Sequence, residues 1–116
     1  TVVSGHGSSD TANFTSTDKL YLLAPGEIYS DWSTSQSTDD TAKDLMRTLD
    51  YYTAQGVTTS NYSGAIKKNG TSASYWWLRA APSSISTGFF FVTSGGDWDA
   101  SAAYITYGVA PAYRLG

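Results

Sequence analysis

The sequence predicts an α+β domain in which one main helix packs on a small, irregular antiparallel sheet. A single stretch, Asp39 to Gln55, has apolar residues at helical spacing, and the last third of the chain holds short aromatic segments separated by glycine and proline. The chain has 116 residues, which is enough for one core and too few for two ordinary domains. We therefore expect residues 1–116 to form a single domain.

The chain is expected to begin with a connector and a short strand. Residues 1–17 are rich in Gly, Ser, Asp and Thr, a composition typical of loops and turns. In Lys19–Leu23 apolar residues fall on both faces, which predicts a strand buried on both sides. Pro25 and Gly26 then turn the chain.

The predicted helix runs from Asp39 to Gln55. Asp39 and Asp40 suit the positive end of a helix, and Gly56 provides a stop signal. The apolar stripe consists of Ala42, Leu45, Met46, Leu49 and Tyr52. We expect this stripe to pack on the sheet.

Four strands are expected after a tight, exposed turn at Lys67–Gly70. They cover residues 75–80, 88–94, 97–107 and 108–115, and the separators include Pro82, Gly95-Gly96 and Gly108. Strands at this spacing predict an antiparallel sheet. The scaffold residues expected to be buried in it are Trp76, Leu78, Phe91, Val92, Val109 and Ala112.

Composition argues against several classes of partner. A net charge of -3 and an isoelectric point near 4.7 provide no basic stripe for a phosphate backbone, so we expect no nucleic-acid partner. No apolar run approaches the roughly 20 residues that cross a bilayer, so membrane insertion is not expected. The absence of cysteine removes disulfides, thiolate metal sites and cysteine nucleophiles, and we expect no cofactor or metal.

Catalytic chemistry has one weak candidate. Asp97 and Asp99 would project to one face of a strand, about 6.5 to 7 Å apart, which suits paired-carboxylate hydrolysis. A polar hairpin tip beside Gly95-Gly96 is the simpler interpretation, because no third titratable group lies near in sequence. The single histidine, His6, lies between glycines and lacks partners. We therefore predict no catalytic residue and no enzymatic activity.

The aromatic residues of the C-terminal segment favour recognition. One face of a strand often meets water, so some of these rings should be exposed among Ser, Thr and Gly, as on adaptable binding surfaces. No Lys, Glu, Gln, Met or Asn follows Arg79. The predicted ligand-binding residues are Tyr75, Ser83, Ser84, Ile85, Ser86, Thr87, Phe89, Asp97, Trp98, Asp99, Ser101, Tyr104 and Thr106.

Five blocks in order resemble a known family. They read "DKLYLLAPGEIY", "YYTAQGV", "YWWLRAAP", "FVTSGGDW" and "GVAPAY". Their order is similar to that of bacterial and phage domains with a C-type-lectin-like fold, a family that includes the variable proteins of diversity-generating retroelements. The resemblance implies a lectin-like fold whose C-terminal face is rewritten at adenines, and the residues after Arg79 match the resulting palette except for Trp98.

The resemblance also implies a biological setting. It implies a non-enzymatic module on a bacterial cell surface or a phage virion, in a tail or fibre, that binds a protein or glycan ligand on a cell surface. The calcium signature of sugar-binding lectins is missing, and Ala110 stands where the family usually has Arg. Calcium-dependent sugar binding is therefore not implied.

Two further expectations concern assembly. Family members carry an extra strand and two helices upstream, so the chain resembles the C-terminal portion of a longer domain, and an N-terminal partner segment or a homo-oligomer would cover its apolar surface. The alternative function is a structural assembly domain of a virion or surface fibre, with the aromatic face buried against a neighbouring copy.

Overall fold

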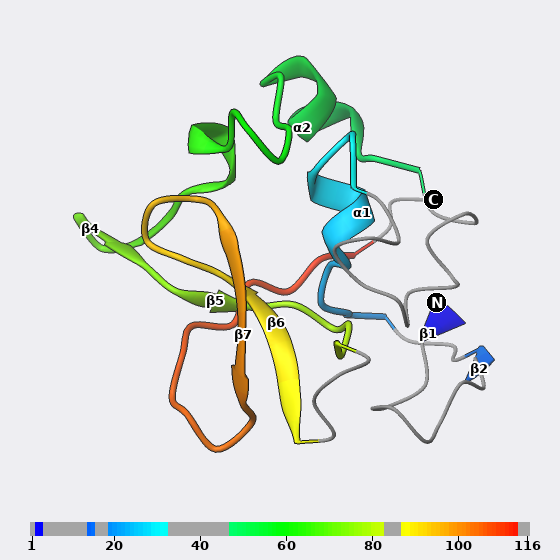
Figure 1. Cartoon of the computed structure of the whole chain (residues 1–116), viewed down its shortest axis with the longest axis vertical. Helices are drawn as coiled ribbons and strands as arrows, with labels where there is room; N and C mark the ends of the chain where they lie inside the picture. Colours follow the sequence, from blue (N-terminus) through cyan, green and yellow to red (C-terminus); the bar gives the residue numbers. More distant parts are fainter. Residues whose placement is uncertain (1, 4–13, 16–18, 33–46, 83–86, 114–116) are drawn as a thin grey trace.

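The computed structural model describes residues 2–3, 14–15, 19–32, 47–82 and 87–113 (Figure 1). These residues form a small mixed fold of short helices and antiparallel strands, which is compatible with the predicted α+β class. In chain order the elements are β1 (Val2–Val3), β2 (Phe14–Thr15), α1 (Pro25–Ile28), α2 (Asp50–Ala54), a 3-10 turn (Ser63–Ala65), β3 (Lys67–Asn69), β4 (Ser72–Ser74), β5 (Trp76–Trp77), β6 (Gly88–Val92) and β7 (Trp98–Ala102).

The central sheet has the strand order β5-β6-β7, and every pairing is antiparallel. Successive side chains alternate between its faces, so the register separates two sets of residues. Val92 opposes both Trp76 and Trp98 on one face, which we call the inner face. Phe91 opposes both Trp77 and Asp99 on the other, which we call the outer face.

The inner face carries the main core of the molecule. Trp32, which follows α1, is 1% exposed and meets Phe90 and Trp98 edge to face, with ring centroids 5.5 and 5.4 Å apart. Tyr29 packs against Trp98 as well, and Figure 1 shows α1 and α2 together on one side of the sheet. The helices and the loops that follow them therefore cover the inner face.

Two hairpin tips depend on glycine. Gly70, with φ +68°, and Thr71 form the turn between β3 and β4, whereas Lys67–Asn69, which were predicted to belong to the turn, form β3. Gly96 lies between β6 and β7 with φ +95°, and its carbonyl accepts a 2.7 Å hydrogen bond from the Tyr29 hydroxyl. That bond fastens the β6–β7 turn to the inner core.

The predicted main helix from Asp39 to Gln55 is corrected by the structure. The described part of this range becomes helical only at Asp50, and Leu49 is extended, with φ -66° and ψ 140°. The Leu49 N–H and the Thr48 hydroxyl donate to the carbonyls of Glu27 and Gly26. Because these contacts hold the segment against α1, an extended backbone replaces helix there; the earlier half of the range lies outside the described residues.

The two predicted terminal strands are also shorter than expected. In Lys19–Leu23 only Tyr21 makes a ladder contact, an isolated bridge to Ala112, and Leu20 is 60% exposed rather than buried. The predicted last strand is reduced to this bridge and one from Gly108 to Trp76. Val109 is 66% exposed because the segment is held only at these points, so its predicted burial is wrong.

Burial of the remaining scaffold residues follows the strand pattern. Trp76, Leu78, Phe91 and Val92 are all buried, as predicted. Ala112 is partly buried and packs against the core. The sequence therefore predicted burial on and beside β5 and β6, whereas it did not predict the irregular segments at Lys19–Leu23 and after Gly108.

Candidate ligand-binding face

The outer face carries an aromatic cluster that we define as Tyr75, Trp77, Phe91 and Tyr107. Tyr107 lies in the middle, with ring centroids 4.7 Å from Phe91, 4.9 Å from Trp77 and 5.0 Å from Tyr75. Phe91 is 4% exposed, whereas Tyr75 is 39% exposed and the other two rings are partly buried. The cluster therefore exposes parts of the Tyr75, Trp77 and Tyr107 rings to solvent, and these rings pack on the buried Phe91.

A short backbone clamp builds this cluster. The Trp77 N–H donates to the Gly108 carbonyl at 3.0 Å, and the Gly108 N–H donates to the Tyr75 carbonyl at 2.9 Å. A Cβ at position 108 would lie 3.0 Å from the Tyr75 oxygen, closer than almost any real side chain, so glycine allows this approach. The clamp brings Tyr107 over the sheet.

A groove of about 330 Å³ adjoins the cluster and shares Trp77 with it. This volume is at the lower end of the range for ligand sites. Its walls are mostly apolar and consist of Leu22, Trp77, Leu78, Arg79, Phe89 and Ala103. Such a groove suits an apolar group of modest size.

The chain bends after β5, and Arg79, which lines the groove, forms an ion pair there. The Leu78 N–H donates to the Phe90 carbonyl while the Phe90 N–H donates to the Ala80 carbonyl, so three residues, 78–80, lie opposite one and the regular pairing of β5 ends at Trp77. Arg79 then donates to Glu27 at 2.5 Å and to the Leu22 carbonyl at 2.8 Å. The pair joins the first and third sequence blocks, and its side chains are 12% and 9% exposed.

The structure separates the predicted ligand-binding residues. The outer face brings together Tyr75, Phe89, Asp99 and Ser101, since Phe89 opposes Ser101 and Phe91 opposes Asp99. Tyr104, Thr106 and Thr87 are exposed near the end of β7, and Tyr104 is 88% exposed. Ser83, Ser84, Ile85 and Ser86 lie outside the described residues.

Trp98 does not belong with this set. It was expected to be exposed toward a ligand, but it lies on the inner face and its ring packs against Tyr29 and Trp32. The reason is its register: it opposes Val92, and even-numbered residues of β7 point into the core. Trp98 is therefore a scaffold residue in this structure.

Three residues that sequence reasoning left out belong to the face: Trp77, Tyr107 and Leu22. Trp77 was not among the predicted ligand-binding residues, although strand alternation after buried Trp76 already places it on the opposite face. Tyr107 and Leu22 approach the sheet through tertiary contacts, which have no local signal in the sequence.

The two aspartates of the proposed carboxylate pair have separate local roles. The Asp97 carboxylate accepts a hydrogen bond from the Thr93 hydroxyl beside the hairpin tip. Asp99 is exposed, and its carboxylate accepts a 2.7 Å bond from the Ala100 N–H. Among the described residues no group of three or more His, Cys, Asp or Glu side chains could hold a metal ion.

One lysine lies over aromatic rings on the inner side of the molecule. The Nζ atom of Lys67 is 5.0 Å from the centre of the Trp76 ring and 5.8 Å from that of Tyr52. Burial lowers the pKa of Lys67 below its ordinary value. The contact belongs to the scaffold, because Trp76 is 2% exposed.

Comparison with known proteins gives one result. A family model described as "Domain of unknown function (DUF6273)" matches residues 2–116. Neither the comparison with curated proteins nor that with solved structures found a match. Within the described ranges, the helices are all too short or too polar to cross a bilayer.

Proposed function

This chain belongs to the family described as a domain of unknown function, DUF6273, and we propose that it is a non-enzymatic module that binds a protein or glycan ligand through the outer face of its β5-β6-β7 sheet. The observation that carries the proposal is the aromatic cluster, whose partly exposed rings lie beside a groove of about 330 Å³. Aromatic rings of this kind supply large contact area at low conformational cost.

Hydroxyl and carboxylate groups border the rings. Ser101 and Asp99 lie in the adjacent strand, opposite Phe89 and Phe91. An apolar centre with a polar rim is the usual arrangement of a recognition surface. The catalytic alternative is less well supported, because the carboxylates of Asp97 and Asp99 are engaged with Thr93 and Ala100.

We propose that the fold is C-type-lectin-like and that the protein acts at a bacterial cell surface or on a phage virion. The support is the order of the five sequence blocks, which resembles the family containing retroelement-diversified variable proteins. In that setting Asp99, Ser101 and Tyr104, which follow Arg79, would be positions where different copies change specificity.

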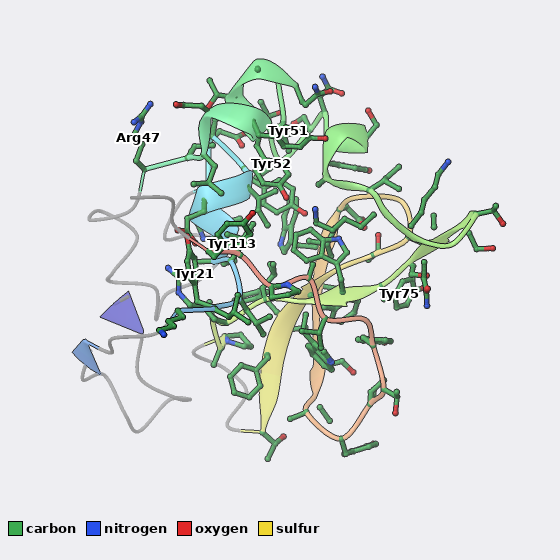
Figure 2. All side chains as sticks on the ribbon, turned by 180° about the vertical axis from the view of Figure 1, so that it is seen from behind. Tyr21, Arg47, Tyr51, Tyr52, Tyr75 and Tyr113 are labelled. Atoms are coloured by element: carbon green, nitrogen blue, oxygen red, sulfur yellow. The ribbon has the colours of Figure 1, made fainter. Side chains whose placement is uncertain are left out.

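The test compares two tyrosines on arrays of surface proteins and glycans. Tyr75→Ala removes a ring from the cluster, and Tyr51→Ala removes a ring from α2 that is more exposed, 62% against 39%; Figure 2 shows the two at separate places on the molecule. We expect Tyr75→Ala to weaken binding at least about 30-fold, the range of an interface anchor, and Tyr51→Ala to leave it unchanged. Equal binding by both variants and the parent would remove the assignment.

A second candidate is a structural assembly domain. It is favoured by exposed apolar residues that are not part of the cluster: Leu20, Val109 and Tyr113 are 60, 66 and 64% exposed. Exposed apolar surface often marks an assembly interface. Light scattering distinguishes the candidates, because an oligomer that persists on dilution and is broken by Val109→Asp supports assembly, whereas a monomer supports ligand recognition.

A further inference from the structure

The outer face carries an uncompensated negative charge. Between Tyr75 and Tyr113 the charged residues are Arg79, Asp97 and Asp99, and Arg79 is paired with Glu27. Asp99 is exposed, and neither aspartate has a cationic partner among the described residues. A ligand with positive charge would be complementary to this surface.

The carboxylate lies next to aromatic rings. Asp99 is directly opposite Phe91 in the antiparallel ladder, a position whose Cα atoms are within about 6 Å in such pairs. Phe91 in turn contacts Trp77 and Tyr107. A cation over these rings would gain both a cation–π interaction and a nearby carboxylate. The molecule already uses such a contact on the other side, where Lys67 lies over Trp76.

The neighbouring groove adds a requirement for an apolar group. Leu22, Leu78 and Phe89 form its walls together with Trp77 and Ala103, and the remaining lining residue is the ion-paired Arg79. Sugar recognition requires several hydroxyl, amide or carboxylate groups directed at the ligand, because buried sugar hydroxyls need partners. Among the residues that the structure describes, this lining has no set of that kind, so it suits an aliphatic or aromatic side chain better than a sugar ring.

We propose that the ligand of the outer face is a basic peptide segment of a protein partner, with a Lys or Arg side chain over Trp77 and Tyr107 beside Asp99, and an apolar side chain in the groove. The proposal rests on the proposed function and names its ligand class. It follows from charge complementarity together with the apolar groove, and it disfavours a glycan.

The experiment measures Kd by fluorescence polarisation with three labelled twelve-residue peptides. One alternates Arg or Lys with Leu and Trp, the second replaces each cation with Glu, and the third replaces each apolar residue with Ser. The basic apolar peptide is expected to bind at least about tenfold more tightly than either relative, and its affinity should fall as salt rises.

Matched charge variants locate the interaction. Asp99→Asn should weaken binding of the basic peptide about five- to tenfold, while Asp50→Asn, which removes the same charge from α2, should not. A glycan array is run in parallel with the parent and Tyr75→Ala.

The outcomes separate the two proposals. Equal affinity for the basic and acidic peptides, or a glycan whose binding depends on Tyr75 while no peptide binds, would overturn the basic-peptide proposal and leave the proposed function standing. Binding that ignores both Tyr75→Ala and Asp99→Asn would overturn both.

Discussion

The two faces of the β5-β6-β7 sheet are both aromatic but are covered in different ways. On the inner face, α1 and the segment after it cover the sheet. Their residues Tyr29 and Trp32 pack on the inner-face residues Phe90, Val92 and Trp98. On the outer face the cover over Phe91 is a set of partly exposed rings held by the Gly108 clamp. Aromatic content alone therefore does not tell whether a face of the sheet stabilises the fold or binds a ligand. The elements that cover each face decide this.

The largest expected effect tests that difference directly. Trp32→Ala should lower the free energy of unfolding by about 3–5 kcal/mol, because it opens a cavity in the inner core. Trp77→Ala should cost about 1–2 kcal/mol, because its ring is already partly in water. Urea titration measures both.

Equal losses for the two tryptophan variants would break the comparison and make the outer cluster part of the core. Trp32→Phe is a useful intermediate. It retains a ring and removes a buried indole N–H that has no hydrogen-bond partner within the described ranges, so it should be milder than Trp32→Ala.

The ion pair between Arg79 and Glu27 gives the second prediction. Glu27→Ala should cost about 3 kcal/mol, because it removes the carboxylate that accepts from Arg79 and from the Ala24 N–H inside the fold. The double change Glu27→Leu with Arg79→Met should recover most of that loss, since apolar residues can replace a buried pair. Thermal and urea unfolding provide the measurement; a double variant as unstable as Glu27→Ala would contradict this account.

The parts of the fold that the sequence predicted are those fixed by local alternation. Burial of Trp76 and Val92 on the inner face follows from a period of two, whereas Phe91 lies on the outer face and is buried because Trp77 and Tyr107 pack on it. The predicted helix from Asp39 was too long at its described end. Residue spacing gives no information on the hydrogen bond that the Leu49 N–H donates to the carbonyl of Glu27, which lies far away in the sequence.

The candidate site was predictable only where it lies on regular strands. Tyr75, Phe89 and Asp99 were identified from composition and alternation. Tyr107 was missed because its position depends on the bridge between Trp76 and Gly108. These two residues are some thirty positions apart and come together only in the folded chain. Trp98 was misplaced because exposure was inferred from residue type without the register.

The third prediction concerns Gly96, in the turn that joins β6 to β7. Gly96→Ala should cost about 2–3 kcal/mol, because a Cβ there would lie 2.2 Å from the Tyr62 carbonyl oxygen and φ is +95°. The matched control is Gly70→Ala, which has a similar positive φ of +68° and no atom within 4 Å, and it should cost only about 1 kcal/mol. Equal costs in urea titration would show that backbone conformation, rather than docking of the turn on the core, is the cause.

The smallest effect is a loss of stability at alkaline pH that originates on the inner side. Burial raises the pKa of Tyr52 to about 12 from 10.0, and burial raises that of Tyr29 in the same direction. The folded state therefore retains protons that the unfolded state releases, so the stabilisation is complete below pH 10 and falls as pH rises toward 12. We expect Tyr52 alone to contribute a loss of roughly 2 kcal/mol over this window, and Tyr29 adds to that loss.

Lys67 acts in the opposite direction, because its lowered pKa makes folding more favourable as pH rises toward the unfolded value of 10.5, and it adds nothing above that. Urea titrations at a series of pH values test the sign. Tyr52→Phe should make the decline between pH 10 and 12 shallower and leave the part due to Tyr29, whereas Tyr104→Phe, which removes a hydroxyl from a ring that is 88% exposed, should retain the parent slope. A decline that persists unchanged in Tyr52→Phe would assign the alkaline sensitivity to groups other than this inner hydroxyl.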